Sequence, residues 1–79
     1  MGIDLDKYDK TFIETFGLEK GMLENLKYQD VKEWDSVGHM NLIGELEDAF
    51  NIELDIDDIT DFSSYQEGKE ILKRYKIEL

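Results

Sequence analysis

The chain has 79 residues, with 20 acidic and 9 basic side chains, a formal net charge of −11 and no cysteine. A chain of this length forms one small domain, here expected over residues 1–79, and leaves little room for a deep catalytic pocket. The lack of cysteine excludes disulfides and thiolate metal sites, and the single histidine excludes a histidine-rich metal site.

The N-terminal sequence shows no targeting signal. MGIDLDKYDK has no apolar run after a basic region, and Asp6 stands where N-myristoylation needs Ser or Thr. No stretch approaches the roughly 20 apolar residues of a membrane span. We therefore expect a cytoplasmic protein with no membrane partner.

The first predicted element is a helix that carries apolar side chains on one face, at Leu5, Tyr8, Phe12, Ile13 and Phe16. Gly17 is suited to end this helix in the left-handed conformation. Residues 18–34 form a long connection without a clear period, and we expect it to pack over the helices. Its apolar anchors are Leu18, Met22, Leu23, Leu26 and Val31.

A second helix is predicted to begin at Asp35 or Ser36, which are both good N-cap residues. Its apolar stripe consists of His39, Leu42, Ile43, Leu46, Ala49 and Phe50. Because His39 opens this stripe, we expect its ring to be packed in the core or at its boundary. Asn51 suits a left-handed exit from the helix.

Residues 51–55 predict a short extended link to a third helix. We expect Asp57 to cap this short helix, which contains Ile59 and has Phe62 at its end. Asp55, Asp57, Asp58 and Asp61 form an acidic cluster here. The cluster lacks the spacing and the glycine of an EF-hand, which leaves weak binding of divalent cations or ordinary solvated acidity.

Ser64 and Glu67 match a capping box at the start of a fourth helix. The inward residues are expected to be Tyr65, Ile71, Leu72 and Tyr75, with Lys69, Lys73, Arg74 and Lys76 in the C-terminal half. The sequence therefore predicts an all-α fold. It is a small four-helix bundle of three main helices and one short helix, with a long first loop.

The charge is distributed unevenly along the chain. From Glu33 to Gly68 there is no Lys or Arg, while 11 acidic residues fall in this stretch. Such a field repels nucleic acid and anionic lipid and attracts basic protein surfaces. We expect no nucleic-acid partner. The acidic stretch either serves solubility alone or forms a surface that docks on basic partners.

The segment Asp35-Ser36-Val37 allows three functions. Asp35, Ser36 and His39 lie within one helical turn, but side chains that radiate from one turn do not give the geometry of a hydrolase triad. Ser36 could instead be only a helix cap. It could also be a hydroxyl that another enzyme modifies, because a helix N-terminus favours a nearby phosphate.

The chain resembles the acyl and peptidyl carrier proteins, whose pattern is Asp-Ser-Leu followed by an acidic helix. Here the sequence reads WDSVGHM over residues 34–40 and ELEDAF over residues 45–50. The resemblance also covers length, helix order, long first loop, short third helix and charge. It implies that Ser36 carries 4′-phosphopantetheine, added from coenzyme A by a phosphopantetheinyl transferase that uses Mg²⁺. The thiol of this arm would hold an acyl or aminoacyl group as a thioester, which fits a chain without cysteine.

The resemblance also implies roles for the neighbours of Ser36. Asp35 would cap the helix and assist the transferase, and Val37 would replace the family's usual exposed Leu. Asn41, Glu45 and Asp48 would face partner enzymes, although the family often has an acidic residue where Asn41 stands. These partners are the transferase, a loading ligase and acyl-processing enzymes with basic docking surfaces.

The resemblance thus predicts a monomeric acyl carrier protein without catalytic activity of its own, serving fatty acid, polyketide or other specialised biosynthesis. The alternative is an acidic helical interaction module that is never modified and that uses the stretch from Glu33 to Gly68 to bind a basic partner.

Overall fold

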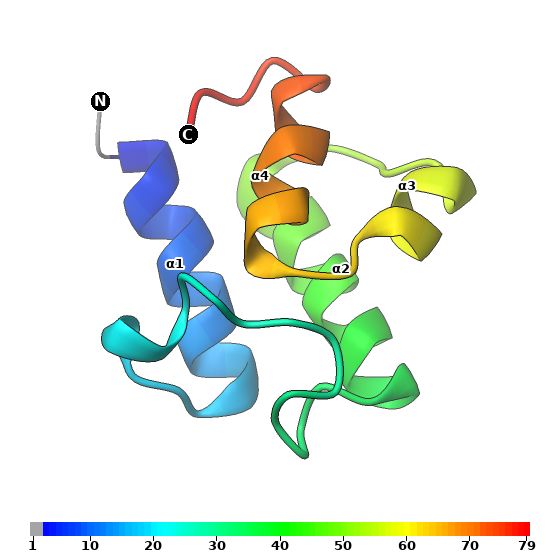
Figure 1. Cartoon of the computed structure of the whole chain (residues 1–79). Helices are drawn as coiled ribbons and strands as arrows, with labels where there is room; N and C mark the ends of the chain where they lie inside the picture. The colour runs from blue at the N-terminus through cyan, green and yellow to red at the C-terminus, as the bar shows by residue number, and fades with distance from the viewer. Residues whose placement is uncertain (1–2) are drawn as a thin grey trace.

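The computed structural model describes residues 3–79, which contain four α-helices and a short 3₁₀ helix joined by loops. The helices are α1 (Ile3–Phe16), α2 (Ser36–Phe50), α3 (Ile56–Asp61) and α4 (Tyr65–Lys73), and the 3₁₀ helix η1 (Lys20–Met22) follows α1 (Figure 1). The predicted all-α bundle with one short helix is therefore confirmed. Among the helices of this range, none has the length and apolar character needed to cross a bilayer.

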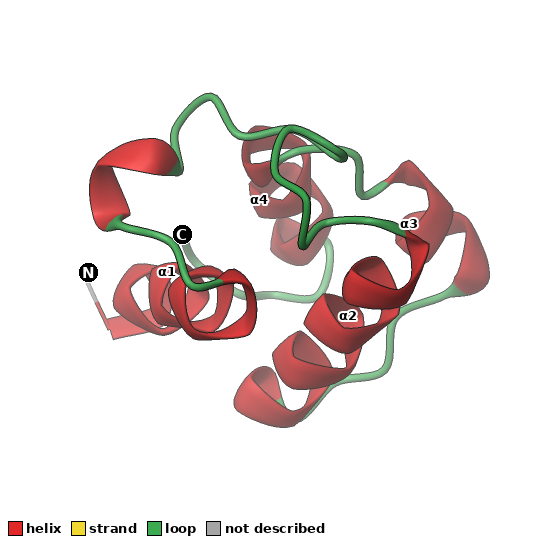
Figure 2. Cartoon of the chain, turned by 90° about the horizontal axis from the view of Figure 1, so that it is seen from below, coloured by secondary structure: helices red, strands yellow, loops and turns green. Residues whose placement is uncertain are grey.

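Helices α1 and α2 pack against each other, α4 lies across them, and α3 lies to one side of α4 (Figure 1). The connection from η1 to α2 crosses one end of the bundle, as the view from below shows (Figure 2). An antiparallel bridge between Lys27 and Ser64 ties this connection to the start of α4. The prediction that the long loop packs over the helices is thus confirmed, although its bridge and its 3₁₀ turn were not predicted.

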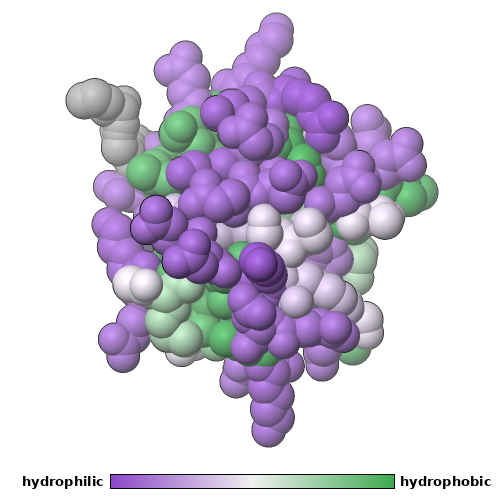
Figure 3. Space-filling view, in the orientation of Figure 1, coloured by the Kyte–Doolittle hydropathy of each residue, from purple (hydrophilic) through white to green (hydrophobic). Residues whose placement is uncertain are grey.

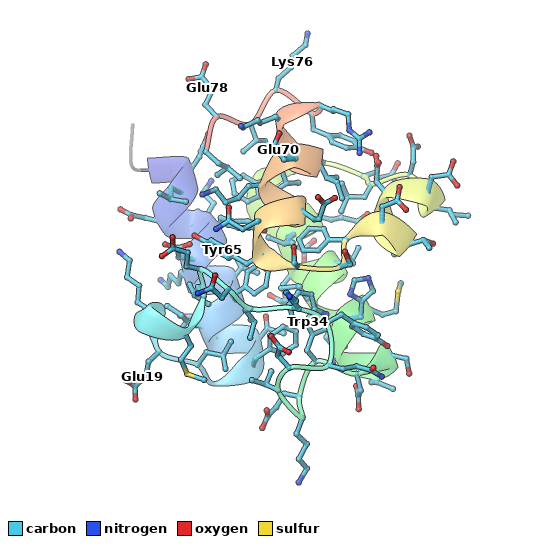
Figure 4. The ribbon with its side chains drawn as sticks, viewed as in Figure 1. Glu19, Trp34, Tyr65, Glu70, Lys76 and Glu78 are labelled. Atoms are coloured by element: carbon cyan, nitrogen blue, oxygen red, sulfur yellow. The ribbon has the colours of Figure 1, made fainter. Side chains whose placement is uncertain are left out.

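Aromatic side chains dominate the core. Trp34 is fully buried, and its ring lies 5.5 Å from that of Phe12 and 5.4 Å from that of Phe16, measured between centroids. Figure 4 shows Trp34 in the middle of the molecule. Of the predicted loop anchors, Leu18, Leu23 and Leu26 are buried and Val31 is partly buried. Met22 was predicted wrongly, because it is 47% exposed at the end of η1.

The helices end in similar ways. Gly17 and Asn51 follow α1 and α2 with φ values of 67° and 55°, as predicted. Lys76 adopts the same conformation, with φ of 66°, shortly after α4. After each of these residues, the next backbone N–H reaches a carbonyl five residues back. The helix α4 ends at Lys73, so the prediction that Arg74 and Lys76 lie within it is wrong.

Helix α3 begins earlier than predicted. Its N-cap is Asp55 rather than Asp57, and the Asp55 side chain makes no capping hydrogen bond. Instead, the Asp55 N–H donates to the Tyr75 hydroxyl at 3.0 Å. Asp58 accepts hydrogen bonds from Tyr75 and from Arg74. Contacts with the two residues that follow α4 therefore decide where α3 starts, and these cannot be read from local capping preferences.

The start of α4 agrees with the sequence. Ser64 is the N-cap, and its hydroxyl accepts a hydrogen bond from the Glu67 N–H at 3.0 Å, which is one half of the predicted capping box. Behind this turn, Gly68 approaches α1 so closely that a Cβ atom there would collide with Phe62 and with the Tyr8 hydroxyl. Glycine therefore lets α4 lie directly on the core.

Two tyrosines of the core are joined by hydrogen bonds between α1 and α4. The Tyr8 hydroxyl donates to the Tyr65 carbonyl at 2.7 Å, and the Tyr65 hydroxyl donates to the Asp9 carboxylate. Tyr65 is drawn beside α1 in Figure 4. Burial raises the pKa of both phenols above the ordinary value, and the Asp9 carboxylate raises them further.

These tyrosines predict a loss of stability at alkaline pH. Because folding raises the pKa of Tyr8 and Tyr65, their stabilising effect is complete below the unfolded value of about 10 and is lost as the pH rises above it. We expect urea midpoints to fall steeply above this pH. The fall with pH should be shallower in Tyr8→Phe than in the wild-type protein, because this variant has one fewer buried phenol to ionise. In Tyr28→Phe the fall should be as steep as in the wild-type protein. Equal slopes for Tyr8→Phe and the unmodified sequence would contradict this account.

Candidate functional site

Asp35 and Ser36 have different positions and roles at the start of α2. Asp35 is the N-cap, and its Oδ1 accepts a hydrogen bond from the Gly38 N–H at 2.8 Å. Ser36 is the first residue of the helix and is exposed. The predicted cap at Asp35 is therefore confirmed. Because the Asp35 carboxylate does the capping, the fold does not need the Ser36 hydroxyl for that purpose.

The backbone before Ser36 is held against the first turn of α2. Gly38 is buried, and a Cβ atom there would collide with the carbonyl oxygen of Glu33 and come within 3.3 Å of the Phe16 ring. Glycine at this position lets residues 33–35 fold tightly over the helix. The close packing fixes the direction in which the chain enters α2, and with it the place of Ser36.

His39 joins the long connection to α2 and α3. The Trp34 Nε1–H lies 3.0 Å from His39 Nδ1, and the His39 Nε2 lies 2.8 Å from the Ile59 carbonyl oxygen. Indole nitrogen can only donate, so Nδ1 accepts this hydrogen bond and Nε2 carries the N–H that donates to the Ile59 carbonyl oxygen. The ring is half-buried, which confirms the expected boundary position.

This arrangement removes His39 as a base for Ser36. Both ring nitrogens are occupied, one by Trp34 and the other by Ile59. The carboxylate of Asp35 is bound to the Gly38 N–H and does not orient the imidazole. The three residues therefore lie in one turn but do not form the linked chain of hydrogen bonds that a hydrolase triad requires.

A groove of about 400 Å³ opens beside Ser36. It lies between α2 and α3, and its lining is mainly apolar and includes the hydroxyl-bearing residues Ser36, Thr60 and Ser63. The full lining is Tyr28, Ser36, His39, Met40, Ile59, Thr60, Phe62 and Ser63. This groove could not be predicted from the sequence, because its walls come from three separate segments of the chain. The volume is in the lower part of the range for small-molecule sites.

The predicted partner residues all lie on the exposed side of α2. Val37 is 69% exposed, and Asn41, Glu45 and Asp48 are exposed along the same helix. Two further apolar side chains are exposed and were not predicted: Met40 of α2 is 55% exposed, and Ile56 at the start of α3 is 80% exposed. The signal for Met40 was present, since it follows Val37 by one turn and lies outside the apolar stripe.

The surface is largely polar. In Figure 3 hydrophilic residues cover most of the visible face, and hydrophobic atoms reach the surface in separate places, on the left of this view as well as at the side where α3 lies. Between Glu33 and Gly68 the chain supplies no Lys or Arg of its own. Basic groups from elsewhere do reach this region, since Lys7 Nζ donates to the Ala49 carbonyl and Arg74 pairs with Asp58.

The acidic cluster on and around α3 does not form a recognisable cation site. Asp58 is bound to Arg74 and Tyr75, and Asp55 and Asp57 are exposed. Within residues 3–79, no group of three or more carboxylate or imidazole side chains is placed so that it could hold a metal ion.

Comparison with known proteins gives no further information about this site. No family model matches the chain, and no significant match is found with a curated protein or with a solved structure.

Proposed function

We propose that this chain is an acyl carrier protein whose Ser36 bears a 4′-phosphopantetheine arm. The observation that carries the proposal is an exposed serine at the first position of α2, next to an aspartate that already caps the helix. The Ser36 hydroxyl is therefore accessible to a modifying enzyme without cost to the helix. The resemblance of the surrounding sequence to carrier proteins supports the same conclusion.

The local structure suits a phosphodiester on Ser36. The backbone N–H groups in the first turn of a helix and the positive end of its dipole favour an adjacent phosphate. The groove beside Ser36 offers apolar walls along which a flexible arm can lie. When bound, the arm supplies a thiol that holds an acyl or aminoacyl group as a thioester. The residues present therefore fit this group.

Attachment needs an enzyme in trans, because neither Asp35 nor His39 is free to activate Ser36. The Ser36 oxygen attacks the phosphorus of coenzyme A that bears the pantetheine, and 3′,5′-ADP leaves as that phosphoanhydride bond breaks. The hydroxyl proton passes to a base of the transferase. We place this reaction in the cytoplasm, where the chain would meet both the transferase and coenzyme A.

The exposed residues of α2 are proposed to guide these partners. Val37 and Met40 give apolar contact, and Glu45 and Asp48 give negative charge beside them. A transferase, a loading ligase or an acyl-processing enzyme with a basic docking surface would match this combination. Asn41 lies between these residues and adds no charge.

The test is intact-protein mass spectrometry after incubation with a promiscuous phosphopantetheinyl transferase, Mg²⁺ and coenzyme A. We expect a mass gain of one phosphopantetheine and none for Ser36→Ala. Ser63→Ala is the matched control, because Ser63 is exposed and lines the same groove. This variant should gain the arm to the same extent as the wild-type protein. If the wild-type protein gains no mass, the proposal is overturned.

The charge distribution favours one alternative, an unmodified acidic module that binds a basic protein. This function requires only the surface between Glu33 and Gly68. It predicts a complex that persists unchanged in Ser36→Ala and weakens with salt, whereas a carrier needs Ser36 for every reaction.

A further inference from the structure

The boundary between α2 and α3 is closed by His39. We call the line where His39 of α2 meets Ile59 of α3 the α2–α3 seam. His39 crosses this seam with its hydrogen bond to the Ile59 carbonyl and is held on its other side by Trp34. The two ring planes are nearly parallel, with an interplanar angle of 14° and 6.2 Å between the ring centroids. The imidazole thus forms part of the floor of the groove beside Ser36.

The space beneath that floor is already filled. Trp34, Phe12 and Phe62 are among the largest fully buried side chains of the protein. Phe62 meets the His39 ring edge-to-face at 6.2 Å, and Phe12 stacks on Phe62 at the same distance. Such cores are close-packed, so a guest chain could enter only if these rings moved apart.

We propose that His39 locks the α2–α3 seam, so that cargo carried from Ser36 stays in the external groove and is not taken into the core. This inference rests on the proposed carrier function and names the class of cargo. Short acyl or aminoacyl groups suit the groove, whereas a long alkyl chain would remain exposed to solvent. His39 is the residue that determines this specificity.

The cost of opening the seam supports the proposal. Moving His39 aside would leave the buried indole N–H of Trp34 without an acceptor, which proteins rarely tolerate. Displacing α3 instead would strain its other attachment, where Asp58 binds Arg74 and Tyr75. Helix α3 is therefore held at two points, by α2 and by the end of α4.

The groove has features that fit a short, partly polar occupant. Met40, Ile59 and Phe62 offer apolar contact, while the hydroxyls of Thr60 and Ser63 offer hydrogen bonds to amide groups. Ser36 lies in the lining itself, so an arm attached there begins within the groove.

The experiment compares cargo of different lengths. A promiscuous transferase loads Ser36 with the acyl-phosphopantetheine of acetyl-, hexanoyl- or dodecanoyl-coenzyme A, releasing 3′,5′-ADP, and cleavage of each thioester by hydroxylamine is followed by intact mass. We expect the three rates to agree within about twofold, since burial of the extra methylenes in a core would change them on the order of tenfold or more. Marked protection of the dodecanoyl form would overturn the inference, while the carrier function would stand.

Two variants of His39 test its role directly. His39→Ala should open the seam, because the Trp34 indole loses the acceptor that holds it and can move aside. Cleavage of the dodecanoyl form should then slow on the order of tenfold relative to the acetyl form. His39→Gln should restore equal rates, because its amide can accept from Trp34 and donate to Ile59. A folded His39→Ala variant with equal rates would contradict the role of His39. If Ser36 accepts no arm at all, the proposed function itself fails.

A readout that does not depend on thioester chemistry completes the test. The indole N–H of Trp34 should give the same NMR shift and the same protection from exchange in the unloaded and the dodecanoyl-loaded protein. Loss of this protection on loading would show that the chain enters the core and would overturn the inference.

Discussion

Replacing Trp34 by alanine is expected to lower the free energy of unfolding by about 3–5 kcal/mol, the usual cost of truncating a buried aromatic side chain. The indole is fully buried against Phe12 and Phe16 and also binds His39. A domain of this size has a total stability of only about 3–5 kcal/mol. The variant should therefore be largely unfolded in water, which circular dichroism in a urea titration measures.

Met22→Ala is the matched control for this change. Met22 belongs to the same connection between α1 and α2 but is 47% exposed, so its loss should change stability by no more than about 0.5 kcal/mol. Trp34→Phe keeps an aromatic ring but removes the donor to His39, and its loss of stability should lie between these two. A Trp34→Ala variant as stable as Met22→Ala would show that the long connection is not part of the core.

Gly68→Ala is expected to destabilise the fold by about 1–3 kcal/mol, the usual cost of overpacking a core. Alanine normally favours a helix over glycine, but the new methyl group would meet the Phe62 ring and the Tyr8 hydroxyl. Phe62 is fully buried, and Tyr8 is fixed by its hydrogen bond to the Tyr65 carbonyl. Neither can retreat without disturbing the packing of α1 against α4.

Gly44→Ala, which also replaces a helical glycine, is expected to change stability in the opposite direction. A Cβ atom at Gly44 has no neighbour within 4 Å, so the substitution should gain up to about 1 kcal/mol from helix propensity alone. Thermal melts of the two variants should thus move in opposite directions. A stabilised Gly68→Ala variant would contradict the close approach of α4 to the core.

The sequence predicted those features that depend on local chemistry. The start of α2 at Ser36, the Asp35 cap, the Ser64 cap and the exits at Gly17 and Asn51 all follow from residue types with strong backbone preferences. Lys76 has no such preference, so its left-handed conformation could not be predicted. The apolar stripe of α2 was likewise predictable from its period, and with it the boundary position of His39.

The features that were predicted wrongly or missed depend on contacts between distant segments of the chain. Trp34 was not predicted to be in the core, because one aromatic residue in a stretch without a period carries no information about its direction. Asp57 was preferred over Asp55 as the cap of α3, since several aspartates there are equally suitable by type and only Tyr75 and Arg74 distinguish them. The groove beside Ser36 depends on the same long-range contacts, so it required the structure.

The hydrogen bond between Trp34 and His39 has a practical consequence. Trp34 is the only tryptophan in the chain and lies two residues before Ser36. Its fluorescence therefore arises from one buried site whose indole N–H touches the floor of the groove. Its emission should stay constant while cargo remains in the external groove and should change if a chain enters the core, so it reports on the core without a dye and without altering the surface that partners would use.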